Sequence, residues 1–491
     1  MRVPAFLSEA LEQFEPVIGL EVHAQLKTRS KLFSTAANAY DPGQPNQFIS
    51  AYCLGLPGVL PVVNAKAVEL AVRAGLALDC QIRSTSIWSR KQYFYPDLPK
   101  GYQISQYDEP VCEHGHLDIQ ATKGPKTVRI LRIHMEEDAG KSVHVDGSPY
   151  SLVDYNRAGV PLIEIVSEPD LRSAQDTVEY LKQLRAILRA IDACDGNMEE
   201  GSFRCDANVS IRPIGETKLG TRCEIKNVNS FRFVEQAIEY EILRQAQRIA
   251  KGDVVVQETR LFDSAKKETR SMRSKEEAHD YRYFPDPDLP PLVLDDAWIE
   301  EIKTTLPELP EATKARWRAL GVPEEHVETF VEDQALARFF DAAIEKHANR
   351  AVGIAQLIKG ELLRELKTDA QGVDIEALGL RPEDLAMLVE LRESDKISST
   401  QQKKLFTAML QKGTPLATLL KDEGQQVEDP EVLKPIVDRI VAANPDVAMK
   451  LKNGNQGVMG FFVGQVMKAT QGKAKPALVR QLIEDAIAKQ P

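Results

Sequence analysis

The sequence lacks any run of about 18 consecutive apolar residues, the length that a membrane-spanning helix requires. It also lacks an apolar stretch behind its first residues, where acidic side chains stand instead. Neither a secretory signal nor a mitochondrial transit peptide is therefore expected. Its six cysteines include no Cys-x-x-Cys pair, so common zinc and redox motifs are absent. We expect a cytoplasmic protein with reduced thiols and no membrane partner.

Basic residues are outnumbered, with 62 Lys and Arg against 73 Asp and Glu, which gives a net charge of −11. Such a balance does not favour general nucleic-acid binding, so any binding site for nucleic acid must be local. One local site is conceivable between Val447 and Ile483, where no acidic residue occurs. The basic residues of this stretch are Lys450, Lys452, Lys468, Lys473, Lys475 and Arg480. They form a candidate site for a phosphate backbone, and the alternative is an ordinary solvated helix face.

The N-terminal part of the sequence combines two hydrophobic periods. Alternation typical of strands occurs at 17–25, 127–133 and 161–166, and helical spacing occurs at 65–78, 173–190 and 230–251. Because the two patterns do not alternate strictly, an α+β fold with an antiparallel sheet is favoured over a doubly wound fold.

The proline-rich segment 285–291 is the strongest boundary signal, since proline at this density continues neither a helix nor a central strand. After it, the chain has the pattern of helices separated by short polar or Pro/Gly segments. A length of 491 residues is compatible with two to four domains. We expect three, at 1–293, 294–410 and 411–491.

Acidic residues gather where strand-like segments end. The run His134–Met135–Glu136–Glu137–Asp138 directly follows one strand-like segment, and Glu199–Glu200 and Glu224 lie in similar surroundings. Bringing carboxylates together is costly unless a cation neutralises them, and such hard oxygen ligands suit Mg²⁺ that bridges phosphates. The alternative is a series of exposed acidic turns.

Glu21 and His23 are two residues apart in a strand pattern, so their side chains share one face. They can bind a metal or form a buried polar pair. Gly140–Lys141–Ser142 resembles the end of a phosphate-binding loop, but Met135 stands where that motif requires glycine. If the protein uses ATP, it must therefore do so through a metal–carboxylate site. No Gly-x-Ser-x-Gly motif supports serine-based hydrolysis.

Several long segments resemble the B subunits of aspartyl/glutamyl-tRNA amidotransferases, in order and over nearly the whole chain. They include VIGLEVHAQLKT from Val17, YFYPDLPKGYQISQ from Tyr93, HMEEDAGKS from His134, MEEGSFRCDAN from Met198 and GFFVGQVMKATQGKAKP from Gly460. The resemblance implies an antiparallel-sheet cradle domain of the glutamine-synthetase-like kinase type, followed by an all-α helical domain and a tail domain similar to YqeY-type proteins.

The resemblance also implies an activity. The side-chain carboxylate of Glu-tRNA(Gln) or Asp-tRNA(Asn) would be phosphorylated by ATP and then amidated. The ammonia would come from glutamine hydrolysed by an amidase-like A subunit, with a small C subunit completing a heterotrimer.

The same resemblance implies ATP and Mg²⁺ as cofactors and gives four metal ligands, Glu21, His23, Glu137 and Glu224, with Glu136 adjacent to them. Zinc is doubtful, because relatives with zinc have a Cys-Pro-Val-Cys run where only Cys53 remains here. Candidate catalytic cations are Lys141, Arg157 and Lys226, with Lys91 as a further basic group. Candidate tRNA contacts are Lys468, Lys473, Lys475 and Arg480.

Two rival functions stay open at this point. The chain could be a non-catalytic scaffold that binds tRNA, or a metal-dependent phosphodiesterase that acts on RNA. The acidic clusters favour chemistry over a scaffold. ADP release that is stimulated by misacylated tRNA would be expected of the amidotransferase alone.

Overall fold

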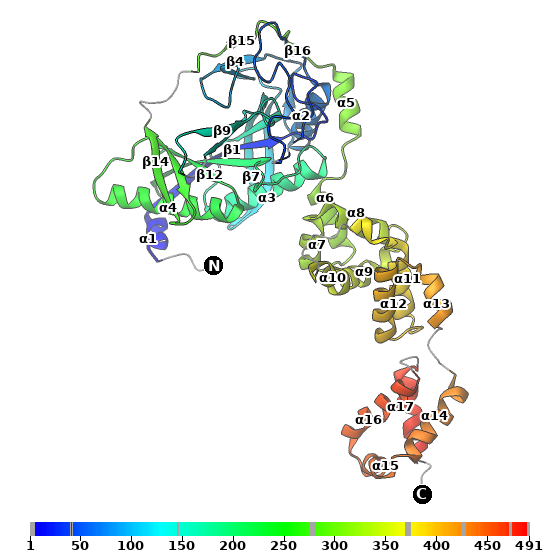
Figure 1. The fold of residues 1–491 in the computed structure, drawn as a ribbon. Helices are drawn as coiled ribbons and strands as arrows, with labels where there is room; N and C mark the ends of the chain where they lie inside the picture. The colour runs from blue at the N-terminus through cyan, green and yellow to red at the C-terminus, as the bar shows by residue number, and fades with distance from the viewer. Residues whose placement is uncertain are drawn as a thin grey trace. The chain divides into compact units, whose positions relative to one another are not determined.

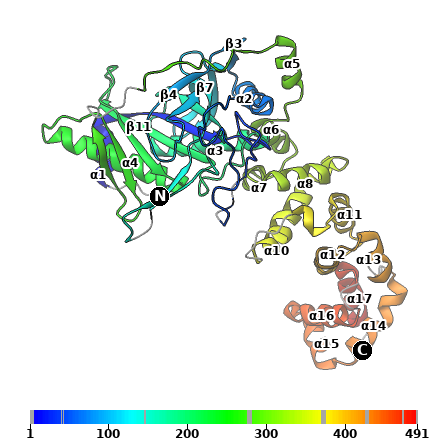
Figure 2. The same ribbon diagram turned by 45° about the horizontal axis from the view of Figure 1, so that its top comes forward.

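The computed structural model describes residues 5–39, 41, 43–144, 147–274, 281–368, 375–423, 429–470 and 474–488. The chain folds as two compact units, one up to Pro310 and one from Glu311. The first contains the sheets and the second is helical (Figures 1 and 2). Among these residues, no helix is both long enough and apolar enough to cross a membrane. The expected α+β class is thus confirmed.

A nine-stranded sheet forms the centre of the first unit. Its strands are β1 (Phe14–Gln25), β2 (Gln81–Ile82), β6 (Cys112–Ala121), β7 (Gly124–Glu137), β10 (Pro161–Ser167), β11 (Phe203–Pro213), β12 (Cys223–Val228), β13 (Glu258–Asp263) and β14 (Glu268–Ser274). They are ordered β14-β13-β12-β11-β1-β10-β7-β6-β2. Neighbours run antiparallel except β12 and β13, which are parallel. The antiparallel sheet expected from the sequence is therefore present, with one parallel pair near its edge.

Four helices of the first unit pack against this sheet: α1 (Ala5–Gln13), α2 (Ala65–Ala77), α3 (Ala174–Ala190) and α4 (Phe231–Ala250). Helix α5 (Asp296–Thr304) packs on α2. The side chains of Asn64, Ser173 and Ser230 cap α2, α3 and α4 by accepting backbone N–H bonds. Helices α3 and α4 contact each other and lie against the sheet (Figure 1). The helices expected at 65–78, 173–190 and 230–251 are therefore confirmed within a residue or two at each end.

Alternation along β1 separates the two faces of the sheet. Ile18 and Val22 are buried in the apolar core that the sheet shares with α3 and α4. Glu21 and His23 lie between such residues in the sequence and project from the opposite face. The polar face is therefore the one that is free to bind a ligand.

Short strands extend the first unit beyond the main sheet. They are β3 (Thr85–Ser86), β4 (Ser89–Gln92), β5 (Tyr102–Ser105), β8 (Lys141–His144), β9 (Ser151–Asp154), β15 (Phe284–Pro285) and β16 (Leu292–Val293). The proline-rich segment supplies β15, which pairs with β4, and leads to β16, which pairs with β3. Arg90 of β4 donates to Asp286 at 2.7 Å and to Asp288 at 2.9 Å. The segment thus packs on the first unit, and the division at 293 and 410 stays a prediction.

The second unit consists of short helices around two apolar cores. The first core contains Trp317, Phe330 and Phe340. It is formed by α6 (Pro310–Ala319), α7 (Glu324–Val331), α8 (Gln334–Ile344), α9 (Ala351–Leu357), a π-helical turn (Ile358–Leu362), α10 (Leu363–Thr368), α11 (Pro382–Glu393), α12 (Ser399–Lys412) and α13 (Leu416–Glu423). The second contains Val437, Phe462 and Ile483. It is formed by α14 (Pro430–Ala442), α15 (Pro445–Lys452), α16 (Met459–Ala469) and α17 (Pro476–Ala488).

Candidate functional site

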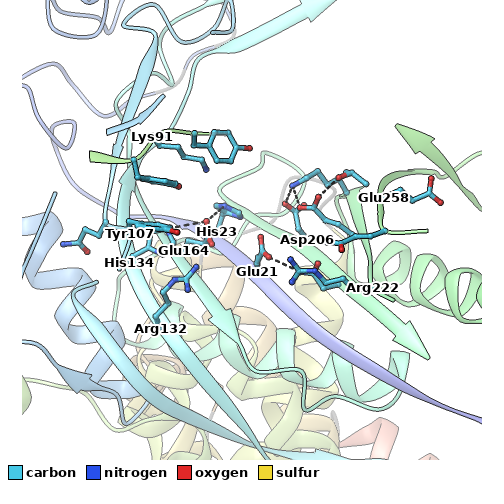
Figure 3. Close-up of a pocket in the computed structure, with 18 residues that line it drawn as sticks. Glu21, His23, Lys91, Tyr107, Arg132, His134, Glu164, Asp206, Arg222 and Glu258 are labelled. Atoms are coloured by element: carbon cyan, nitrogen blue, oxygen red, sulfur yellow. Dashed lines mark hydrogen bonds and ion pairs between the residues drawn. The ribbon is translucent and has the colours of Figure 1, made fainter. Parts of the chain in front are cut away.

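A pocket of about 380 Å³ lies on the polar face of the large sheet (Figure 3). Its floor is made by side chains of β1, β7, β10, β11, β12 and β13. It is lined by Glu21, His23, Lys91, Gln106, Tyr107, Arg132, His134, Glu164, Asp206, Asn208, Arg222, Glu224, Lys226, Gln257, Glu258, Thr259, Tyr281 and Tyr283. Charged groups of both signs dominate this lining, so the pocket suits a highly charged ligand.

Strand register decides which of these side chains meet. Across the β1–β10 and β10–β7 pairs, His23 lies opposite Glu164, and Glu164 lies opposite His134. Across the β1–β11 pair, Glu21 lies opposite Asp206. Directly opposed residues share a face and lie within contact distance. Residues far apart in the sequence are thus aligned in two adjacent rows.

The first cluster consists of His23, Glu136 and Glu164, whose ligand atoms all lie within 4.8 Å of one another. His23 Nε2 is 3.1 Å from Glu164 Oε2 and 3.7 Å from Glu136 Oε1. Burial opposes ionisation of Glu164, but the neighbouring His134 and His23 outweigh it and hold the pKa of Glu164 well below its ordinary value. This carboxylate is therefore ionised and ready to hold a cation.

The second cluster consists of Glu21, Asp206 and Glu224, again with ligand atoms within 4.8 Å of one another. Lys226 Nζ donates to Asp206 at 2.5 Å and lies 2.8 Å from Glu224. Burial raises the pKa of Glu21, and the negative charges of Glu164 and Glu224 raise it further. Because a single lysine faces three carboxyl groups, the cluster keeps excess negative charge, which a bound cation would neutralise.

Both clusters fit a divalent cation. Carboxylate oxygens are the ligands that Mg²⁺ prefers, and the imidazole of His23 is also compatible with Mn²⁺. Lys91 and Lys226 line the same pocket and can contact phosphate oxygens. Although burial favours the neutral amine, the charges of Asp206 and Glu224 raise the pKa of Lys226, so that it remains a cation. The pocket can therefore bind metal and phosphate together.

Six of the expected site residues line or adjoin this pocket: Glu21, His23, Lys91, Glu136, Glu224 and Lys226. Two further acids complete the clusters, and sequence analysis did not select them. Glu164 is the one acidic residue within the apolar strand segment 161–166, and Asp206 stands at an alternating position of β11. The alternation of side chains along each strand could have indicated which face of the sheet these two acids occupy. Only the pairing of the strands shows which residues lie next to them.

Glu137 lies on the other face of the sheet, because consecutive strand residues point in opposite directions. It is ion-paired with Lys100 and accepts a hydrogen bond from the Ile104 amide at 3.0 Å. Lys100 Nζ also donates to the Tyr52 hydroxyl at 2.8 Å. Glu137 therefore joins neither acidic cluster.

Lys141 and Arg157 do not line the pocket either. Lys141 begins the exposed hairpin strand β8. Arg157 donates to the carbonyl oxygens of Ala139 at 2.9 Å and Gly140 at 2.6 Å, and lies 3.7 Å from Asp138. Through these contacts the Arg157 side chain stabilises the turn that follows β7, so its role in the structure is to support this turn.

The remaining expected residues lie elsewhere. Lys468 lies in the last turn of α16 and Arg480 lies on α17, and both side chains are exposed. Lys475 directly precedes α17, and Lys473 lies outside the described residues. Cys53 is buried with its sulfur 3.5 Å from Lys31 Nζ and 3.3 Å from Ser50 Oγ. The proposed metal clusters thus do not involve this cysteine.

Comparison with known proteins gives consistent similarities along the chain. The family model described as "GatB/GatE catalytic domain" matches residues 16–300, and one described as "GatB domain" matches residues 338–487. The chain is 51% identical over 474 residues to the aspartyl/glutamyl-tRNA(Asn/Gln) amidotransferase B subunit of Syntrophotalea carbinolica, covering 96% of this chain and 98% of the relative. It is 52% identical over 476 residues to the protein of the same name from Myxococcus xanthus, with the same coverage.

Proposed function

Because the chain belongs to the GatB/GatE family of tRNA-dependent amidotransferases, we propose that its pocket activates the side-chain carboxylate of a misacylated tRNA with ATP. The substrate is Glu-tRNA(Gln), Asp-tRNA(Asn) or both. One observation carries this proposal: two three-ligand clusters, His23/Glu136/Glu164 and Glu21/Asp206/Glu224, meet on one polar sheet face beside Lys91 and Lys226.

The chemistry requires activation, because a carboxylate has no good leaving group for attack by ammonia. A carboxylate oxygen attacks the γ-phosphorus of ATP, ADP leaves, and an acyl phosphate forms. Ammonia then attacks the acyl carbon, phosphate leaves, and the amide loses a proton to solvent. Divalent cations bound by the clusters would neutralise charge on the phosphates. Lys91 and Lys226 provide positive charge beside them.

The proposed partners follow from this chemistry and from the family. The relatives are named as B subunits of an amidotransferase, which implies a multi-subunit enzyme that acts on tRNA. We propose an amidase-like A subunit as the source of ammonia and a small C subunit as the third component. ATP and Mg²⁺ are the proposed cofactors.

The first prediction concerns the isolated chain. With ATP, Mg²⁺ and Glu-tRNA(Gln) or Asp-tRNA(Asn), it is expected to form the amide from ammonium but not from glutamine, because its motifs include no glutaminase signature. ADP release should rise when the misacylated tRNA is added. Correctly charged Gln-tRNA(Gln) serves as the control. ATP hydrolysis at the same rate with and without misacylated tRNA would contradict the proposal. No ATP hydrolysis under any of these conditions would also contradict it and would favour the scaffold.

The second prediction concerns the tail. Each contact with a phosphate releases a counterion, so replacing Lys468, Lys475 and Arg480 by Gln should lower the salt slope of tRNA binding by up to ~3 units. Filter binding between ~50 and ~200 mM salt measures the slope. The matched control replaces three exposed lysines of the first unit, Lys123, Lys266 and Lys303. Equal slopes for wild type and the tail variant would show a solvated helix face.

A further inference from the structure

Gln106 carries a buried amide group that the catalytic clusters do not use. The side chain follows β5, is 1% exposed and lines the pocket. Its Oε1 accepts hydrogen bonds from the backbone N–H groups of Val111 and Met135, both at 3.1 Å. Two donors to one atom fix the orientation of the amide, because the NH₂ group cannot accept them. The Nε2 atom is buried and has no hydrogen-bond partner within the part of the chain that the structure describes.

Arg132 presents a second such donor. It lies on the pocket face of β7, and its Nε is buried without a partner among the described residues. The Nδ1 atom of His134, two residues along the strand, is also buried without a hydrogen-bond partner among the described residues. A buried donor without a partner is costly, so the two donors Gln106 Nε2 and Arg132 Nε beside one cavity indicate a ligand that supplies acceptors.

None of the described acidic residues accepts a hydrogen bond from Gln106 Nε2 or Arg132 Nε, although Glu164 and Glu136 lie 3.5 and 3.8 Å from His134 Nε2. Figure 3 shows Tyr107, His134 and Arg132 on one side of the pocket, away from Asp206 and Glu258. We call the wall that Gln106, Arg132 and His134 form the donor wall. A cation on the second cluster, Glu21, Asp206 and Glu224, would draw phosphate groups toward the side away from Arg132.

We propose that Gln106 and Arg132 bind the side-chain carboxylate that is to be activated, and so hold the misacylated amino acid against the donor wall. This inference rests on the proposed function. A carboxylate accepts hydrogen bonds at both oxygens and pairs well with a guanidinium, which matches the two unpartnered donors. One oxygen can be held in this way while the other faces the phosphates.

The same arrangement would discriminate substrate from product. The amidated product presents an NH₂ group where the substrate has a carboxylate oxygen. The product amide can bind in two orientations. In one, its NH₂ group faces Gln106 Nε2, so that two donors oppose each other. In the other, its NH₂ group faces Arg132, and the hydrogen bond from Arg132 is lost. A polar site of this kind rejects a ligand that leaves its groups unpaired. Gln106 is therefore a specificity-determining residue that favours release of the amide.

Gln106→Glu is the sharpest test. Glutamate keeps an oxygen for the Val111 and Met135 amides and replaces only the pocket-facing NH₂ by an oxygen. In the assembled enzyme, the KM for Glu-tRNA(Gln) should rise at least ~10-fold, while inhibition by Gln-tRNA(Gln) becomes relatively stronger, because the new oxygen accepts from its amide. The ratio of the two tRNA affinities should shift by ~10-fold or more toward the product, with unchanged affinity for ATP.

Gln257→Glu is the matched control, since Gln257 lines the same pocket beside Glu258 and its replacement adds the same charge. The inference predicts that only Gln106→Glu changes the preference between acid and amide. Equal behaviour of the two variants would overturn it.

Arg132→Lys keeps the charge, removes the Nε–H donor and should raise the KM in the same direction. It decides the question if Gln106→Glu does not fold. A wild-type enzyme that shows no ADP release with misacylated tRNA would instead refute the proposed function, whatever these variants do.

Discussion

Replacing Glu21 by Gln is expected to stabilise the metal-free protein and, at the same time, to lower Mg²⁺-dependent phosphoryl transfer by ~10²-fold or more. The fold raises the pKa of Glu21 through burial and through the charges of Glu164 and Glu224. A carboxyl group whose pKa is higher in the folded than in the unfolded state opposes folding when it is ionised. At neutral pH an uncharged amide therefore removes a destabilising term.

The amide preserves the local geometry, because Glu21 Oε1 accepts from Asn208 Nδ2 at 2.9 Å and Gln retains this oxygen. Thermal unfolding with a chelator should give a higher Tm for Glu21→Gln than for wild type, and added Mg²⁺ should stabilise the variant less. Tests of tRNA-dependent ADP release on the same samples measure the loss of activity.

Glu258→Gln is the opposing control within the same pocket. Burial works against its ionisation, but bonds from Ser271 and Arg260 outweigh burial and lower the pKa of Glu258. A carboxylate with a lowered pKa stabilises the fold above its ordinary titration range, so its replacement should lower the Tm at neutral pH. If Glu21→Gln also lowers the Tm without metal, or keeps full activity, the assignment of the second cluster is wrong.

Replacing Lys100 by Met is expected to reduce the free energy of unfolding of the first unit by ~3–5 kcal/mol. The side chains of Lys100 and Glu137 are 6% and 2% exposed, and they pair with each other. Removing the ammonium leaves a buried carboxylate uncompensated, and this costs far more than the pair itself contributes.

A double-variant cycle separates these two quantities. Glu137→Gln retains an oxygen for the Ile104 amide, so Lys100→Met combined with Glu137→Gln should recover most of the lost stability. Denaturant unfolding gives the four values. Lys66→Met, which breaks the exposed pair with Glu69, should change stability little. Additive effects of Lys100→Met and Glu137→Gln would disprove the coupling.

Local patterns were sufficient to predict strands β1, β7 and β10 of the large sheet and helices α2, α3 and α4, but not the other strands of the sheet. The alternation around Glu21 and His23 identified β1 and placed both side chains on one face, because strand geometry has a fixed period of two. Helix α2 was predicted at 65–78, where helical spacing is clear, and the structure shows that Asn64 caps it. These features depend on neighbours in the sequence, which a single chain displays directly.

The composition of the two clusters could not be predicted in this way. Glu136 and Glu137 are adjacent acids in one motif, and only the packing of β7 decides that the first faces the pocket and the second faces Lys100. Glu164 and Asp206 join the clusters through pairings of β1 with β10 and β11. Register between distant strands is set by the whole sheet, so no local pattern contains it.

The central position of β1 also has a consequence during protein synthesis. This strand is near the N-terminus, yet its two neighbours in the sheet are β10 and β11, and Phe14 pairs with Pro213. At ~5–20 residues per second, a ribosome takes roughly 10–40 s to add the intervening chain. Until β10 is made, the nascent strand, with its apolar face, has no partner on either side, and the side that pairs with β11 stays open for the whole interval. Chaperones that bind extended apolar segments would therefore be expected to hold β1 until β11 has emerged.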